Sequence, residues 1–424
     1  MDCKVWPASS AFNAQPKTRM FLMKRFFTVA PLALAIAATP ALAQDTEQTL
    51  ERMQQQLNSM QQQLNSARNT GVRFNGFFST GYARASNDAG YAGITEESEV
   101  KDLSLFALQG TFDVTQQSQI VMQLVGRGAD DWEPKVEWAY LSHRPTNNLQ
   151  LRAGKMRIPF FMYSDSLEVG YAQPWARPPQ SVYGPIAVTS YVGADATYNF
   201  NFDNSSLTTT FFTGFTDEEG NSGDVELRNI AGLNLTWTDY VWTVRAVAAT
   251  AEADIDATRL AALVPPNVTV DSQLADGDRG NFYGLGASYD DGSWQIIGEV
   301  TRVEVDGKFA DTDSAYLSVG HRFGSWTPYI AAGWTESKDD EERLGLFINQ
   351  PQAGIVVPEN ILNYQRNEYS VGTRWDITPG VAIKADITHV RGLQKGAGNL
   401  NTEYMLTNNT NSTNVYTLKL ESAF

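Results

Sequence analysis

The amino-acid sequence predicts an all-β transmembrane barrel of about 16 antiparallel strands, preceded by a short coiled-coil helix. Three observations lead to this prediction. Apolar and polar residues alternate along strand-length segments up to the last residue, Phe424. The connections between these segments alternate between short turns and longer loops. No segment after the N-terminal region reaches the roughly 18 consecutive apolar residues that a membrane-spanning helix needs.

The first 43 residues predict an export signal behind an extension. A basic start at Met23-Lys-Arg is followed by an apolar run and by an Ala-x-Ala site that ends at Ala43. We therefore expect residues 23–43 to be a signal peptide that is cleaved after Ala43. Residues 1–22 carry no targeting pattern, and we interpret them as a wrongly assigned start of the chain.

Composition narrows the classes of protein. Removing residues 1–43 takes away five basic residues and one acidic residue, which leaves 27 basic and 47 acidic residues and a net charge of −20. This charge argues against nucleic acid as a partner. The only cysteine, Cys3, lies in the removed piece, so the mature chain is expected to have neither disulfides nor thiol chemistry.

Residues 45–68 have the periodicity of a coiled coil. The heptad Met-Gln-Gln-Gln-Leu-Asn-Ser occurs twice, and apolar residues recur at spacings of three and four. The predicted seam consists of Leu50, Met53, Leu57, Met60 and Leu64. An isolated helix of this length is marginal in water, so we expect it to associate between subunits in the periplasm. The alternative is a polar, glutamine-rich linker.

From residue 72 to residue 424 the chain predicts sixteen strands and no helix. The expected ranges are 72–85, 101–115, 117–126, 134–144, 148–158, 190–202, 205–215, 225–237, 240–252, 280–290, 292–304, 312–323, 326–337, 367–378, 380–391 and 413–424. Short turns rich in Asp, Asn, Gly and Pro alternate with longer connections, notably 159–189, 253–279, 338–366 and 392–412. Short turns on one side and long loops on the other are typical of outer-membrane barrels.

The faces of the predicted strands fit a barrel with a wet interior. In the last strand, Tyr416, Leu418, Leu420 and Phe424 share one face, and polar residues occupy the other. Many inner faces carry charges, which suit a water-filled lumen because an unpaired buried charge is costly. Tryptophans cluster near the short turns and predict an aromatic girdle at one membrane interface: Trp237, Trp242, Trp294, Trp326 and Trp375.

Together these features resemble the Gram-negative sixteen-stranded trimeric porins. The resemblance is carried by Phe424, by the barrel at 72–424, and by a long third external loop at 160–189. The basic strand Leu149-Gln-Leu-Arg-Ala-Gly-Lys-Met-Arg-Ile-Pro159 is similar to the strand before the constriction loop of phosphate-selective and general porins. A coiled coil before the barrel is similar to the DcaP-like and sucrose porins. The sequence does not decide between the DcaP-like type and the phosphate-selective porin O/P-like type. The chain lacks a long run of lumen arginines, which argues against phosphate selectivity.

The resemblance implies a third loop that folds inward and narrows a pore. It also implies a homotrimer among outer-membrane lipid and lipopolysaccharide, and an assembly machinery that reads the strand ending at Phe424. For the constriction we expect Arg152, Lys155, Arg157, Asp165, Glu168 and Arg177. Lys155 and Arg157 have lipid-facing parity unless Gly154 marks a bulge.

Strand parity also predicts charges on the lumen wall: Arg73, Lys135, Arg228, Arg245, Glu299, Arg322, Arg374, Lys384 and Lys419. Acids on the loop opposite bases on the wall create a transverse field that sets ion selectivity. The alternative is that these charges only pair with each other in a hydrated wall.

Catalysis and metal binding have little basis in the sequence. None of the three histidines, His143, His321 and His389, neighbours a serine motif, and no His/Cys cluster exists. We therefore expect neither enzyme activity nor a cofactor. The leading hypothesis is a passive channel for small hydrophilic solutes or ions. The alternative is a non-channel outer-membrane barrel, either an adhesin or an enzyme barrel plugged by its loops.

Overall fold

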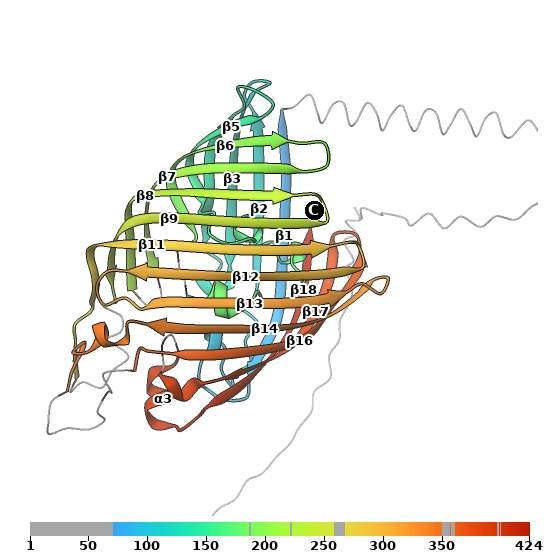
Figure 1. The fold of residues 1–424 in the computed structure, drawn as a ribbon. Helices are drawn as coiled ribbons and strands as arrows, with labels where there is room; N and C mark the ends of the chain where they lie inside the picture. The colour runs from blue at the N-terminus through green and yellow to red at the C-terminus, as the bar shows by residue number, and fades with distance from the viewer. Residues whose placement is uncertain are drawn as a thin grey trace, which may run out of the picture. The chain divides into compact units, whose positions relative to one another are not determined.

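A computed structural model describes residues 71–185, 188–220, 223–257, 268–349, 357, 361–396, 398 and 400–424. In this part of the chain, sixteen antiparallel strands close into one barrel (Figure 1). The predicted barrel fold is thereby confirmed. The predicted signal peptide at 23–43 and the coiled coil at 45–68, with all its seam residues, lie outside the described residues.

The barrel strands follow one another in chain order. They are β1 (Val72–Ala85), β2 (Leu105–Asp113), β3 (Ser118–Arg127), β4 (Pro134–His143), β5 (Leu149–Arg157), β6 (Ser190–Asn201), β7 (Ser206–Gly220), β8 (Gly223–Thr238), β9 (Trp242–Asp256), β11 (Gln273–Asp290), β12 (Trp294–Val305), β13 (Asp311–His321), β14 (Trp326–Lys338), β16 (Gln365–Thr378), β17 (Val381–Arg391) and β18 (Ser412–Ala423). Each strand pairs with its neighbours in the chain, and β1 pairs with β18. Two further short strands, β10 (Val268–Val270) and β15 (Phe347–Asn349), pair with each other outside the barrel.

The helices of the described residues are short and lie in the loops. They are η1 (Tyr91–Gly93), η2 (Gly128–Asp130), η3 (Ser164–Ser166), η4 (Gly170–Ala172), α2 (Gln180–Tyr183), η6 (Asp340–Arg343), η7 (Leu393–Lys395) and α3 (Thr402–Thr407). Within the described part of the chain, no helix is long and apolar enough to cross a membrane.

The outer face of the barrel is apolar. On β18 the side chains of Tyr416, Leu418 and Leu420 are exposed, while Thr417 and Glu421 on the other face are buried. Trp326 and Trp375 stack on neighbouring strands with ring centroids 5.2 Å apart, close to short turns. An apolar band edged by aromatic residues is the surface that a barrel presents to lipid.

The barrel closes at the last residue. Phe424 and Gly76 exchange two backbone hydrogen bonds of 2.9 Å. A Cβ atom at Gly76 would lie 2.5 Å from the Phe424 ring and 2.8 Å from the Ala107 carbonyl oxygen. Glycine is therefore required where the terminal ring crosses β1.

The height of the wall differs around the barrel. Strands β2 to β5 have nine or ten residues, whereas β7, β8, β9 and β11 have 15 to 18. About ten residues span a bilayer, so the longer strands project beyond it. Much of the loop predicted at 253–279 is therefore strand, and β7 continues through the acidic stretch at 217–219.

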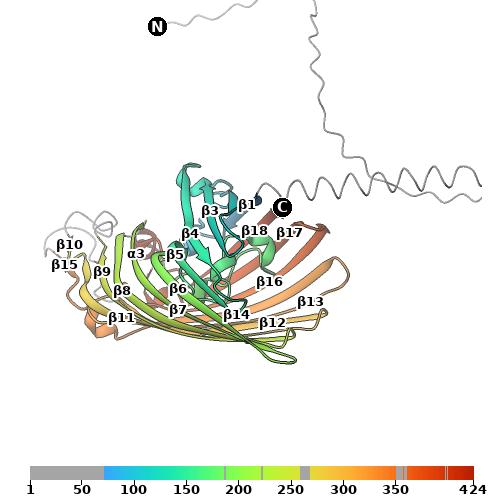
Figure 2. The ribbon, with the colours of Figure 1, turned by 90° about the horizontal axis from the view of Figure 1, so that it is seen from above.

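Long loops gather at one end of the barrel. We name them L1 (86–104), L3 (158–189), L5 (257–272), L7 (339–364) and L8 (392–411). L1, L5, L7 and L8 share one buried apolar cluster, to which they contribute Tyr91, Ile94, Val268, Leu346, Phe347, Ile361, Leu393 and Leu400. L3 follows β5 and folds into the ring of strands (Figure 2).

Candidate pore constriction

L3 crosses the barrel interior and rests on the wall far from its own strand. Its helix α2 contacts β12, β13, β14 and β16, and η4 contacts β18. The aromatic side chains of L3 account for this course, because they pack on inner-face residues of those strands. Phe160 stacks on Phe282 at 4.4 Å between ring centroids, and Trp175 meets Tyr316 edge-on at 5.6 Å.

Glu299 is one buried anchor for L3. Its carboxylate accepts hydrogen bonds from the Met162 backbone N–H at 2.8 Å and from the Tyr183 hydroxyl at 2.5 Å, both in L3. A third bond comes from the Tyr316 hydroxyl on the wall at 2.8 Å. Three donors satisfy a carboxylate that is almost fully buried, so Glu299 holds both ends of the loop against β12.

Three wall cations hold the main chain of L3. Arg245 donates to the carbonyl oxygens of Pro159 and Phe161. Arg374 donates to those of Tyr171 at 2.6 Å and Gln173 at 2.9 Å, and Lys384 donates to those of Gly170 at 2.5 Å and Trp175 at 3.1 Å. These predicted lumen residues are thus placed inside the barrel, where they bind loop carbonyls.

Arg157 and Glu168 belong to a four-residue charge cluster at the start of L3. Arg157 lies 3.0 Å from both Glu168 and Glu137. Arg127 lies 2.5 Å from Glu168 and also pairs with Glu137. Two cations and two anions neutralise each other, so this cluster fixes the loop and presents little net charge to a passing ion.

Asp165 is the carboxylate that L3 leaves exposed. Among the described residues it forms no ion pair. Coulomb interactions link it to Arg152 and Arg245 on the wall. Arg152 is itself bound in a forked arrangement to Asp195, with contacts of 2.7 and 3.0 Å, and its guanidinium lies over the Tyr140 ring. Asp165 is therefore within electrostatic range of Arg152, whose own charge is balanced by Asp195.

The other predicted wall charges on the inner face are mostly paired. Lys135 pairs with Asp130 at 3.0 Å, Arg322 with Asp290 at 2.5 Å, Lys419 with Glu421 at 2.9 Å, and Arg73 with Asp113 at 2.5 Å.

Lys155 forms no ion pair with the predicted constriction residues in the described part of the chain, although its charge acts on Glu137 of the four-residue cluster. It pairs with Ala139 on β4 and with the outward-facing Val192 on β6, in a register that runs without a shift through Gly154. Gly154 does not form a bulge, so Lys155 keeps the outward parity of its strand. Arg157 has the same parity, but it is the last residue of β5, and its buried side chain pairs with Glu137 and Glu168. Gly154 is nevertheless needed, because it has φ of +138° and a Cβ atom would lie 2.3 Å from the Ala139 carbonyl oxygen.

Arg228 lies on the opposite face from the one that alternation predicts. A bulge between Arg228 and Ala231, where Asn229 has φ of +52°, reverses the parity of β8 beyond it. Leu227 therefore packs inward beside the buried Ala253. Arg228 is half exposed and pairs with Asp254 on the other face.

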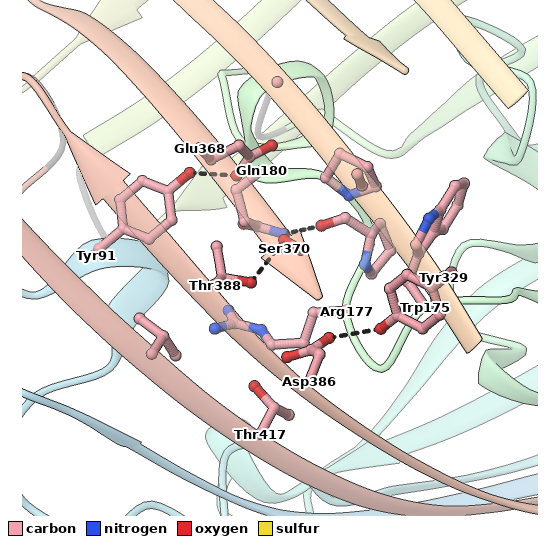
Figure 3. Close-up of a pocket in the computed structure, with 15 residues that line it drawn as sticks. Tyr91, Trp175, Arg177, Gln180, Tyr329, Glu368, Ser370, Asp386, Thr388 and Thr417 are labelled. Atoms are coloured by element: carbon pink, nitrogen blue, oxygen red, sulfur yellow. Dashed lines mark hydrogen bonds between the residues drawn. The ribbon is translucent and has the colours of Figure 1, made fainter. Parts of the chain in front are cut away.

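Arg177 lies at a small polar pocket between L3 and the wall (Figure 3). It donates to the Ala92 carbonyl oxygen of L1 at 2.9 Å. Burial lowers the pKa of Arg177, although the nearby Asp386, Tyr91 and Glu368 favour its charged form. Burial and the charge of Glu368 raise the pKa of Tyr91 well above its usual value.

Sequence reasoning missed Tyr91, Glu368 and Arg127. Alternation places Glu368 on the inner face of its strand, and this inward carboxylate is the one sign of a site that the sequence offers. Its partner Tyr91 is 277 residues away in a loop, so no local pattern joins them. Within the described ranges, no three His, Cys, Asp or Glu side chains are arranged to hold a metal ion.

Comparison with solved structures identifies the fold, whereas no protein-family model and no curated sequence matches the chain. The trimer form of in-vitro folded OmpT, an outer membrane protein of Vibrio cholerae, has a TM-score of 0.52 at 12% identity, with 83% of this chain and 99% of that one covered. An anion-selective porin from Comamonas acidovorans has a TM-score of 0.51 at 15% identity, covering 83% and 99%. The outer membrane channel DcaP of Acinetobacter baumannii has a TM-score of 0.51 at 11% identity, covering 83% and 97%. The chain therefore has the fold of the outer-membrane porins.

Proposed function

We propose that this protein is a porin of the bacterial outer membrane, through which small hydrophilic solutes or ions diffuse passively. The observation that carries the proposal is L3, which is clamped inside a closed barrel and carries an exposed carboxylate, Asp165. A fixed inward loop narrows a passage without moving during transport, as a passive channel requires.

Selectivity in this proposal depends on few residues. The cluster of Arg127, Glu137, Arg157 and Glu168 is internally neutral, and Arg245, Arg374 and Lys384 are occupied by loop carbonyls. Arg152 is paired with Asp195, so Asp165 remains as the exposed charge of L3 that forms no ion pair among the described residues. In this proposal Asp165 and the nearby Arg152 set the preference for cations or anions.

Two further features belong to the proposal. The long-loop end faces the outside, because short turns of such barrels face the periplasm. The protein assembles as a homotrimer, which the trimer form of one solved protein of this fold supports.

A plugged, non-channel barrel is the competing function. The shared apolar cluster of L1, L5, L7 and L8 favours it, because these loops pack together at one mouth of the barrel. An adhesin or an enzyme barrel would need such a closed mouth but no ion path.

Conductance separates the two functions. Purified protein is added to a planar bilayer in potassium chloride, with a heat-denatured sample as the control. A porin gives discrete, ohmic steps, and liposomes that contain it swell in small sugars but not in large ones. Absence of steps from correctly folded protein, judged by its β-sheet circular dichroism, would reject the channel.

A further inference from the structure

We propose that L1 is a second part of the constriction and docks together with L3 as one unit through Glu368. This inference rests on the proposed channel function, in which L3 forms the narrow passage. It assigns roles to Tyr91, Arg177 and Ser181 as positioning residues, since they hold loops and need not touch the solute.

Glu368 joins both loops to the wall. It lies on the inner face of β16, where its side chain is buried. One carboxylate oxygen accepts the Tyr91 hydroxyl of L1 at 2.7 Å. The other accepts the Ser181 backbone N–H at 3.1 Å and the Ser181 hydroxyl at 2.7 Å, both from L3. Figure 3 shows Tyr91 and Glu368 meeting at the edge of the pocket.

A direct contact also connects the two loops. Arg177 of L3 donates to the carbonyl oxygen of Ala92, the residue that follows Tyr91. Ala92 has φ of +55° and lies between Gly90 at +74° and Gly93 at +76°. A non-glycine residue in the left-handed region is held there by its surroundings. The turn at 90–93 therefore depends on its docked partners.

Shared use of one carboxylate makes the docking of the two loops cooperative. If either loop withdraws its donors, Glu368 stays buried with fewer hydrogen bonds, which is unfavourable. Docking of L1 therefore favours docking of L3, and the reverse holds by the same amount. L1 also exposes Glu96, Glu97 and Val100. A contact made on that exposed side can be transmitted to L3.

The test measures the mobility of L1 while L3 is mutated. A spin label is placed at Glu97→Cys in the mature chain, which otherwise has no cysteine. Ser181→Ala in L3 should increase the mobility of this label in L1. Ser205→Ala, in the short turn before β7, is the matched control and should leave the label unchanged. Equal mobility in wild type and Ser181→Ala would overturn the coupling.

Channel recordings provide the second measurement. Tyr91→Phe and Ser181→Ala should each raise the frequency of partial closures several-fold, and their combined effect should differ from the product of the two. Tyr369→Phe, on the same strand but exposed on the outer face, should behave like wild type. Independent, multiplicative effects would refute the coupling. If wild type does not conduct at all, the proposed channel fails, while the label measurement still decides whether the loops are coupled.

Discussion

Arg245, Arg374 and Lys384 show what becomes of charges inside this barrel. Alternation along their strands places all three on the inner face, and the structure agrees. Arg374 and Lys384 pair with Asp376 and Glu421 on the wall. All three cations also bind backbone carbonyls of L3, which no sequence pattern reveals because these contacts join residues 84 to 214 positions apart. The sequence thus predicts which face of the strand these side chains occupy. The contacts that they make depend on how L3 folds.

Asp165 should set ion selectivity. We expect Asp165→Asn to shift the permeability ratio toward anions by about twofold, because it removes the exposed negative charge of the constriction loop. Arg152→Gln should shift it toward cations, since it also leaves Asp195 unpaired. Reversal potentials under a dilute salt gradient measure both shifts. If neither variant moves the potential, the narrowest point lies elsewhere.

Glu168 should affect stability more than selectivity. Glu168→Gln removes an anion that contacts Arg127 and Arg157, and it leaves the buried Arg157 with only Glu137. We expect a loss of roughly 1–3 kcal/mol in the free energy of unfolding. The shift of the reversal potential should be smaller than for Asp165→Asn, because the cations left in excess, Arg127 and Arg157, are largely buried. Urea unfolding of the refolded protein measures the loss. Glu96→Gln on exposed L1 is the control, and a similar loss there would contradict the assignment.

At the scale of elements, hydrophobic alternation was sufficient to place all sixteen barrel strands. It failed where strands leave the membrane. Beyond the bilayer both faces of a strand meet water, so the ends of β7, β8, β9 and β11 lose their alternation and resemble loops. The reversal at Asn229 was equally hidden, because a bulge shifts parity without changing composition. The short strands β10 and β15 contain three residues each, too few to form a pattern.

The seam between β1 and β18 offers a test of closure. Gly76→Ala would place its methyl group against the Phe424 ring and the Ala107 carbonyl oxygen. We expect overpacking to cost roughly 1–3 kcal/mol. Gly280→Ala, whose methyl group would make only ordinary contacts at 3.7 Å or more, is the control. The heat-dependent shift of the folded band in gel electrophoresis compares them, and equal melting of both variants would argue against a tight seam.

At the scale of the whole molecule, the chain combines a barrel with a predicted coiled coil at 45–68. The barrel closes on its own strands, so the coiled coil is not needed to complete it. Its twice-repeated heptad predicts association between copies of the chain.

Deletion of 45–68 should therefore weaken the trimer and spare the pore. We expect the truncated protein to dissociate at a lower temperature in detergent, because the helices no longer hold subunits together. Its conductance per barrel should stay close to that of the full mature chain. Native gel electrophoresis over a temperature series measures dissociation. A truncated trimer as heat-resistant as the intact one would identify the segment as a linker.

The pairing of Phe424 with Gly76 has a topological consequence. The barrel begins and ends on adjacent strands at the same end, so a short flexible bridge of about six residues could join residue 424 to residue 71. Opening the chain in the turn at 239–241 would then make β9 the first strand and β8 the last. Such a circular permutant keeps every strand pair, so it should refold in detergent to the same barrel. The permutant would end at Thr238 and would lack the terminal aromatic residue. It would therefore test whether the barrel can close without an aromatic residue at the end of the chain.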